Sequence, residues 1–332
     1  MKARCAVPGA LLVVASAMQA QDLQSSKCPG GAPLSPAQVA QDACQQAYDV
    51  YQLLSPQLGL ALTGGNATAG QGGVLGGVGH FSIGVRVNGF SGLLPDVSNA
   101  AFTPRTAGAS PARTLPTTTH LIGLPTADAA IGLFRGLPLG LTNVLGLDAL
   151  LSGSYVPNVD QSNVTIKPHT NWQFGYGARV GLLSESIITP GVSFTWIERD
   201  LPTTDISASQ NNAQLQVLDA KVKTNAWRVV ASKSLVMFGV AVGGGRDHYA
   251  QSANVSGSVS GILSGSATAP GTSQTLNRTN LFADLSFNLP LFKIVGEIGQ
   301  ASGGTVATYN SFAGGRADRS QVYGSVGLRL SR

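Results

Sequence analysis

Side chains that could act as catalytic groups are few and scattered in this sequence. His80 and Ser82 lie two residues apart and would share one face of a strand, and Arg246, Asp247 and His248 are consecutive. A histidine beside a serine or an aspartate is the usual basis of nucleophilic hydrolysis. The strained Gly-x-Ser-x-Gly turn that exposes a serine nucleophile is absent from the sequence. We therefore predict no catalytic residue and no enzymatic activity.

Other patterns that could bind a cofactor or a metal are equally weak. Glycine runs precede Arg246 and Arg316, but neither run ends in the Gly-Lys-Ser/Thr sequence that surrounds a phosphate. The four histidines, at positions 80, 120, 169 and 248, do not have the spacing of metal ligands. We predict no cofactor and no metal.

Residues 1–20 have the layout of a secretory signal peptide. Lys2 and Arg4 precede an apolar run through Ala17, and small residues lie near Ala20. The run is too short for a spanning helix. We expect export and cleavage near Ala20.

Only two cysteines remain after the expected cleavage, Cys28 and Cys44. In an exported protein such a pair is typically oxidised. We predict a Cys28–Cys44 disulfide, which closes a loop whose restriction would contribute roughly 3 kcal/mol.

The composition is unusual for a protein surrounded by water. Only 11% of the residues are charged, 42 are glycine, and the mean hydropathy is +0.15. Soluble domains usually carry about 25% charge. Without Lys2 and Arg4 the formal charge falls from +5 to +3 (19 basic minus 16 acidic residues), with no basic cluster. These values exclude nucleic acid as a partner and indicate that part of the surface meets something other than water.

One helix is predicted near the N-terminus. Ser35–Gln38 reads as a capping box with Pro36 at the first helical position, and apolar residues then recur on one face until Pro56. A glycine-rich linker with little to pack follows at 63–79. We treat 21–76 as an N-terminal helical and linker segment that plugs a barrel or caps its periplasmic mouth.

Residues 77–332 alternate with the period of β-strands. In 171–183 an aromatic and aliphatic face opposes a face of glycine, Gln173 and Arg179. Long connections near 91–117, 157–170, 200–213, 249–277 and 301–318 alternate with tight turns near 135–142, 183–187, 232–234 and 290–291. Taking 214–231 as one long protruding strand, the pattern predicts about ten strands, with a range of eight to fourteen.

Alternation occurs in soluble sandwiches as well as in transmembrane barrels. Export, low charge, alternating loop lengths and polar faces rich in glycine and serine together favour the barrel. We predict an all-β fold, an antiparallel transmembrane β-barrel at 77–332 in the cell outer membrane. Its apolar face, which includes Phe174, Val180, Phe194 and Leu285, would meet outer-membrane lipid. The residues predicted to face the lumen are Arg86, Asp148, Gln173, Arg179, Asp284, Lys293, Glu297 and Arg329.

The helix-bearing N-terminal segment followed by "GGNATAGQGG" at 64–73 is loosely similar to the long-chain fatty-acid transporter family of Gram-negative outer-membrane β-barrels. The resemblance implies a porin-like channel or transporter for small, in part hydrophobic, solutes, with barrel-assembly machinery as a partner during biogenesis. The alternative is a structural or adhesive barrel whose lumen is filled by side chains and whose surface loops carry the function.

The turn at Pro290 and Leu291 fixes one strand register. A two-residue turn there places Asn288 opposite Lys293 and Asp284 opposite Glu297. Two facing carboxylates repel unless a cation or proton intervenes. We expect either a ladder with Arg329 or Arg86 or a cation-attracting constriction in the lumen.

Overall fold

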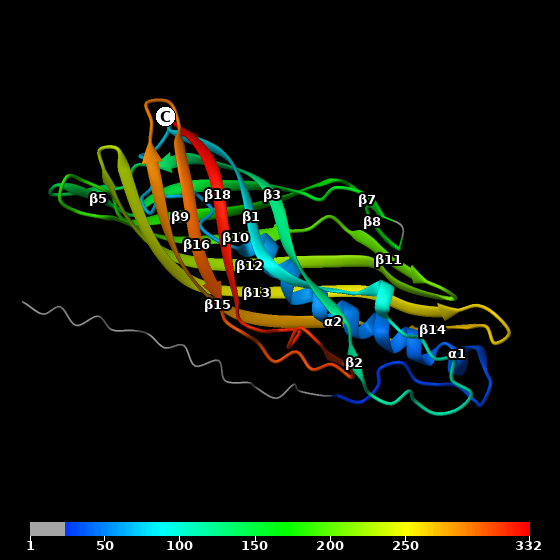
Figure 1. Ribbon diagram of the computed structural model, residues 1–332. Helices are drawn as coiled ribbons and strands as arrows, with labels where there is room; N and C mark the ends of the chain where they lie inside the picture. Colours follow the sequence, from blue (N-terminus) through cyan, green and yellow to red (C-terminus); the bar gives the residue numbers. More distant parts are fainter. Residues whose placement is uncertain (1–23, 162) are drawn as a thin grey trace, which may run out of the picture.

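The computed structural model of the chain describes residues 24–161 and 163–332 (Figure 1). The expected signal peptide, residues 1–20, lies outside the described residues. A helix of the length and apolarity needed to cross a membrane is not found in the described part of the chain.

Antiparallel strands close into a ring in the described chain. β13 pairs with β15 on one side and with β12 on the other, and the remaining strands connect these two in an unbroken series. Ten strands make the ring, as the sequence predicts. They are β1 (Phe81–Pro95), β3 (Thr117–Phe134), β6 (Gly146–Tyr155), β9 (Trp172–Leu183), β10 (Gly191–Asp200), β12 (Ala213–Leu235), β13 (Phe238–Val259), β15 (Ser273–Asn288), β16 (Lys293–Ala301) and β18 (Gln321–Ser331).

The two ends of the ring differ in the length of their connections. At one end, called the short-turn end, the connections are brief, although 135–145 carries a small hairpin of β4 (Leu137–Leu139) and β5 (Thr142–Val144). β1 starts and β18 finishes there, with Phe81 bonded to Arg332. At the opposite, long-loop end, β2 (Thr114–Leu115) pairs with β17 (Ser311–Phe312) and joins the 96–116 and 302–320 connections, the former also holding the 3-10 turn η1 (Val97–Asn99).

Several segments expected as loops are strands that extend the sheet beyond the ring. β7 (Val159–Gln161), β8 (Val164–Pro168) and β11 (Thr204–Gln210) continue from β12, and β14 (Gly265–Ala269) pairs with the outer part of β13. The expected loops 157–170 and 200–213 are thus wrong in their secondary structure, whereas 249–277 contains an extended hairpin of β13 and β14, one of the two forms that its serine- and glycine-rich sequence allows. Their polar, glycine- and serine-rich composition suits a sheet that is exposed on one face. We call these strands and the outer parts of β12 and β13 the strand extension.

Along the ring strands, outward positions are mostly apolar and exposed, whereas inward positions are buried and include the charged side chains of the wall together with apolar ones such as Phe90 and Leu150. On β9, Phe174 is 73% exposed and Arg179 is 0% exposed. Of the other positions predicted to face lipid, Leu285 and Phe194 are exposed and Val180 is half-buried. Exposure of such an apolar belt to water would be unfavourable, whereas contact with the hydrocarbon core of a membrane suits it.

The N-terminal segment forms two helices, α1 (Pro36–Val39) and α2 (Gln41–Thr63). The Ser35 hydroxyl caps α1 by accepting from the Gln38 N–H, as the capping box predicts. The expectation that Pro56 ends the helix is wrong, because α2 continues through Pro56 to Thr63. A proline inside a helix removes one backbone hydrogen bond, and the packing of α2 within the barrel compensates for that loss.

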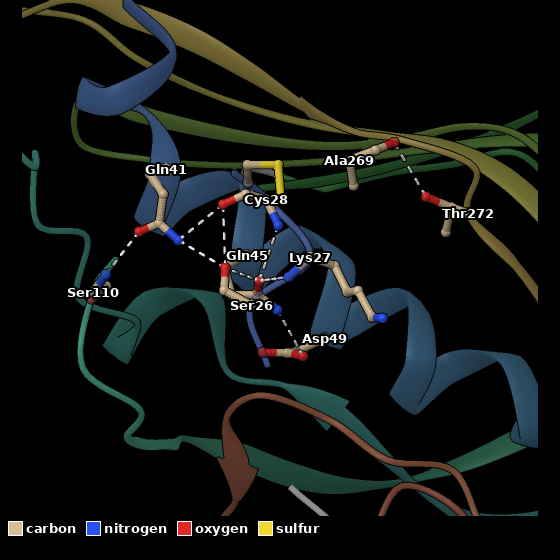
Figure 2. Close-up of a disulfide and its surroundings, with 10 residues drawn as sticks. Ser26, Lys27, Cys28, Gln41, Gln45, Asp49, Ser110, Ala269 and Thr272 are labelled. Atoms are coloured by element: carbon tan, nitrogen blue, oxygen red, sulfur yellow. Dashed lines mark hydrogen bonds between the residues drawn. A yellow bond between two sulfur atoms is a disulfide. The ribbon is translucent and has the colours of Figure 1, made fainter. Parts of the chain in front are cut away.

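The first half of α2 packs on the inner face of the strand extension, outside the ring (Figure 1). Its small face includes Ala43 and Ala47, which meet apolar residues of β12, β13 and β14. Close approach requires glycine at position 257, since a Cβ there would collide with the backbone between Ala43 and Cys44. The predicted disulfide is confirmed: Cys28 and Cys44 are bonded and buried beside the strand extension (Figure 2).

The outward parity of the ring strands can be tested with one substitution. Leu285→Arg, on the exposed belt of β15, should destabilise the refolded barrel by roughly 2–4 kcal/mol, because a guanidinium is placed in hydrocarbon. The measurement is denaturant-induced unfolding in lipid vesicles. Ile262→Arg is the control, since Ile262 is fully exposed between β13 and β14. Equal tolerance of both changes would contradict the lipid-facing assignment.

Candidate functional site: the closed barrel lumen

The second half of α2 and the residues after it occupy the inside of the ring. Every residue from 59 to 68 is buried. α2 enters from the long-loop end, and the chain then runs to the short-turn end, where β1 begins (Figure 1). We call residues 59–75 the plug and its non-helical part, 64–75, the linker. The second half of the helix therefore lies inside the barrel, and the helix does not cover the short-turn mouth.

The carbonyl groups at the end of α2 are capped by side chains of the barrel wall. An α-helix leaves its last four carbonyls without helical partners, and these carry the negative end of the helix dipole. Asn88 Nδ2 donates to the carbonyls of Leu60 (3.2 Å) and Ala61 (3.0 Å). The next three carbonyls accept from arginines on three strands: Leu62 from Arg199 (3.4 Å), Thr63 from Arg228 (3.1 Å) and Gly64 from Arg86 (2.7 Å). A helix terminus that would otherwise be unsatisfied is thus held by positive charge.

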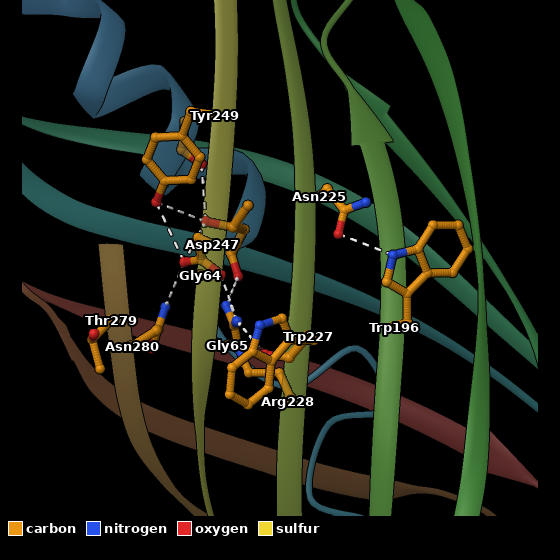
Figure 3. A network of polar contacts seen from close by, with 12 residues as sticks. Gly64, Gly65, Trp196, Asn225, Trp227, Arg228, Asp247, Tyr249, Thr279 and Asn280 are labelled. Carbon is orange, nitrogen blue, oxygen red and sulfur yellow. Dashed lines mark hydrogen bonds and ion pairs between the residues drawn. The ribbon is translucent and has the colours of Figure 1, made fainter. Parts of the chain in front are cut away.

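Two carboxylates on the wall pair with these three arginines. Asp128 on β3 accepts from Arg86 Nε at 2.7 Å and from Arg199 Nη2 at 3.3 Å. Asp247 on β13 pairs with Arg228 and also accepts from the Thr63 hydroxyl at 3.1 Å (Figure 3). A buried charge is tolerated only when it is paired and hydrogen-bonded. The network therefore keeps one net positive charge, which faces the negative end of the helix dipole.

Further wall residues hold the linker. Arg329 Nη1 donates to the carbonyls of Thr68 (3.1 Å) and Ala69 (2.6 Å). Arg179 donates to the Thr68 hydroxyl and pairs with Asp148 at 2.6 Å, and Asp148 accepts from the Leu75 N–H. The expectation that residues 63–79 have little to pack is therefore wrong. The glycines allow close approach, and the polar backbone of the linker finds its partners on the wall.

The predicted register of β15 and β16 is confirmed, with Asp284 opposite Glu297 and Asn288 opposite Lys293. The carboxylates face the plug rather than an arginine ladder. Asn66 donates from its backbone N–H to Glu297 Oε2 at 2.7 Å and from its side chain to Asp284 Oδ2 at 3.1 Å. Neither an ion pair with Arg329 nor one with Arg86 forms at these two carboxylates within the described chain.

The residues predicted to face the lumen divide into two groups. Six of them contact the plug or its charge network, and two, Gln173 and Lys293, are half-buried without a described bond to the plug. Sequence reasoning missed Asn88, Asp128, Arg199, Arg228 and Asp247. Arg199 lies four residues after Thr195 on the inward face of β10, so extending that alternation finds it. Arg228 lies within the expected long strand 214–231, at a buried position of β12.

Loops fasten the outer half of α2 at the long-loop end. The Asp49 carboxylate accepts from the backbone N–H groups of Tyr309 and Asn310, each at 3.0 Å. Burial raises the pKa of Asp49 to about 6, although these hydrogen bonds act in the opposite direction. On the same face, Gln45 accepts from the backbone of Lys27, beside the disulfide (Figure 2). Helix, loops and strand extension thus form one packed layer over the ring.

The candidate chemical groups do not converge. Ser82 is buried on β1, whereas His80 precedes that strand and is exposed. Asp247 points inward, and His248 lies outward beside Asn277. A histidine with two aspartates does occur on the strand extension, where His169 Nε2 lies 3.3 Å from Asp205 and 3.9 Å from Asp219. All three are substantially exposed, and exposed acidic groups commonly carry no ion.

No protein-family model matches the sequence, and no curated protein matches it either. Solved structures match at low similarity. The translocator domain of the autotransporter NalP from Neisseria meningitidis is 11% identical, with 89% of this chain and 99% of that chain covered and a TM-score of 0.34. The Ralstonia pickettii toluene transporter TbuX is 11% identical, with 91% and 98% covered and a TM-score of 0.26. A loop-deletion mutant of OmpT, an outer membrane protein of Vibrio cholerae, is 8% identical, with 78% and 100% covered and a TM-score of 0.20. The barrel of this chain is established by its own strand pairing.

The importance of the capping arginines can be measured at Arg228. Arg228→Met should destabilise the protein by about 3–5 kcal/mol, because it leaves Asp247 buried without its partner charge and Thr63 without its cap. Denaturant unfolding followed by tryptophan fluorescence gives the value. Arg246→Met is the control on the exposed side of β13, where we expect little change. An Arg228→Met protein as stable as the control would refute the charge network.

Proposed function

We propose that this chain is an outer-membrane β-barrel that its own N-terminal segment keeps closed and that displays a packed layer at the cell surface. The observation that carries the proposal is the capping of five successive carbonyls at the end of the plug helix by Asn88 and three wall arginines. The role is non-enzymatic, which the separation of the histidines from the serine and aspartate supports.

The surface layer would comprise α1, the outer half of α2, the disulfide and the strand extension. Outer-membrane barrels have short periplasmic turns and longer extracellular loops. On that basis the short-turn end faces the periplasm and the strand extension faces outward. A disulfide suits this side, because it persists in oxidising surroundings. The mature N-terminal segment would then lie at the cell surface and Arg332 on the periplasmic side.

Passage of a small solute is the second candidate function, and the polar character of the linker contacts favours it. The linker is held by hydrogen bonds to charged side chains, which water can replace, and not by a large apolar core. If the plug moved, the lumen would be a polar channel lined by residues such as Arg179, Asp148 and Arg329. The two candidate functions differ in whether the plug leaves the lumen.

Conductance of the refolded protein in planar bilayers distinguishes the closed barrel from a barrel that passes solutes. The full mature chain should be silent, because residues 59–68 and the wall side chains fill the lumen. A variant that lacks residues 24–76 should give discrete openings if its ring still closes, which heat-modifiable migration on a detergent gel would verify. Openings of comparable size in the full chain would overturn the closed-barrel proposal and support transport.

Orientation can be tested with a short epitope at three places. Insertions between Gly30 and Gly31 and at Gly271 should be bound by antibody on intact Gram-negative cells, since both positions are exposed at the long-loop end. An insertion at Val236, which is 97% exposed in the β12–β13 turn, should be bound only after permeabilisation. The reverse pattern would contradict the proposed orientation.

A further inference from the structure

Two buried carboxyl groups face each other on the barrel wall beneath the plug. Asp284 on β15 and Glu297 on β16 are directly paired in register and are 4% and 8% exposed. Each gives one oxygen to the linker. Glu297 Oε2 accepts from the Asn66 N–H at 2.7 Å, and Asp284 Oδ2 accepts from the Asn66 side chain at 3.1 Å and from the Gly70 N–H at 3.0 Å.

The other two oxygens have no donor among the described residues. Asp284 Oδ1 and Glu297 Oε1 are both buried without a partner, although the register places the two residues directly opposite each other. An ionised carboxylate only accepts hydrogen bonds. Two buried carboxylates that face each other repel, whereas a proton between their unpartnered oxygens turns one group into a donor to the other.

The surroundings favour a proton over a metal ion. Among the described residues, Arg86 on β1 and Arg329 on β18 are cations near the pair. Arg86 donates to Asp128 and to the Gly64 carbonyl, and Arg329 Nη1 donates to the Thr68 and Ala69 carbonyls, while Arg329 Nε has no protein partner there. Two guanidinium groups would repel a metal ion, and hard cations need about six or more oxygen ligands. The Tyr323 hydroxyl on β18 is engaged by Asn280 and the Gly65 N–H, and Ala241 lies opposite Asp284 on β13.

The linker fits this pair closely. Gly65 has a φ of +84°, and a Cβ there would collide with Glu297 Oε1. Asn66 then bridges both carboxyl groups, so the geometry of the pair fixes the linker at the point where it leaves the helix.

We propose that Asp284 and Glu297 share one proton and form a pH-sensitive latch on residues 64–70 of the plug. With the proton present the pair carries a single negative charge and holds Asn66 and Gly70. When base removes the proton to solvent, two negative charges face each other in a buried site without an ion pair. Hydration then becomes the available compensation. Water enters, and the linker exchanges its bonds to the pair for bonds to water.

The inference rests on the proposed closure of the lumen. Amide hydrogen exchange of the refolded protein in micelles tests the latch independently of the conductance measurement. Protection of the Asn66 and Gly70 amides, corrected for intrinsic exchange rates, should fall at least about tenfold between about pH 6 and about pH 9 as the linker opens locally. The Gly72 and Leu75 amides are the internal reference, because they donate to Ser232 and Asp148 and not to the pair.

Glu297→Gln is the matched variant. Its carboxamide keeps an acceptor for Asn66 and supplies a permanent N–H donor to Asp284, so protection should stay high and independent of pH. Asp284→Asn places the carboxamide on the other residue of the pair and is used if Glu297→Gln folds poorly.

Amide protection that does not change with pH in the unaltered protein would overturn the latch. A fall in protection of the same size in either folded variant would also overturn it. Loss of protection on adding a chelator at constant pH would also overturn it, by showing that a metal ion bridges the pair. Open channels in the unaltered protein at neutral pH, with the exchange pattern intact, would refute only the closed-barrel function.

Discussion

The structure depends on the capping of the C-terminal carbonyls of α2 by side chains of the barrel wall. A helix that ends inside a barrel cannot rely on bulk water for its last carbonyls, and each unpaired buried carbonyl costs free energy. Asn88, Arg199, Arg228 and Arg86 complete the cap, which the Gly64 N–H begins at the Leu60 carbonyl. Asp128 and Asp247 pair with the three arginines and leave one net positive charge toward the helix end. The buried charges of the wall therefore have a structural role, which is to cap the carbonyls at the end of α2.

Anchoring of the plug in the lumen also fixes the position of the outer half of α2 at the long-loop end. Because the plug is tied to β1, β10 and β12, the outer half of α2 is held in position over the strand extension, where small residues such as Ala43 pack on the sheet. The disulfide and the bonds of Asp49 fasten the same half-helix to neighbouring loops. The plug in the lumen and the packed layer at the long-loop end are thus connected through α2. Displacing the plug would therefore disturb contacts in both.

The lumen combines apolar contacts around the plug with a buried charge network, and this network distinguishes its closure from that of a purely hydrophobic core. Buried ion pairs add little net stability when compared with well-packed apolar residues, but removing one partner is strongly destabilising. Such networks specify one arrangement of the chain and respond to changes of charge. The facing carboxyls Asp284 and Glu297 are the part of the wall whose charge state bears most directly on the linker.

The sequence by itself determined the ring of ten strands, the inward parity of residues such as Arg179, the Cys28–Cys44 disulfide and the pairing of Asp284 with Glu297. These features follow from periodicity, turn chemistry and cysteine count, which are local. Tertiary structure decided the path of α2 past Pro56, the burial of the linker and the partners of the wall charges. Those contacts join residues about 30 to more than 200 positions apart, and they exist only because closure of the ring brings distant strands around one helix end.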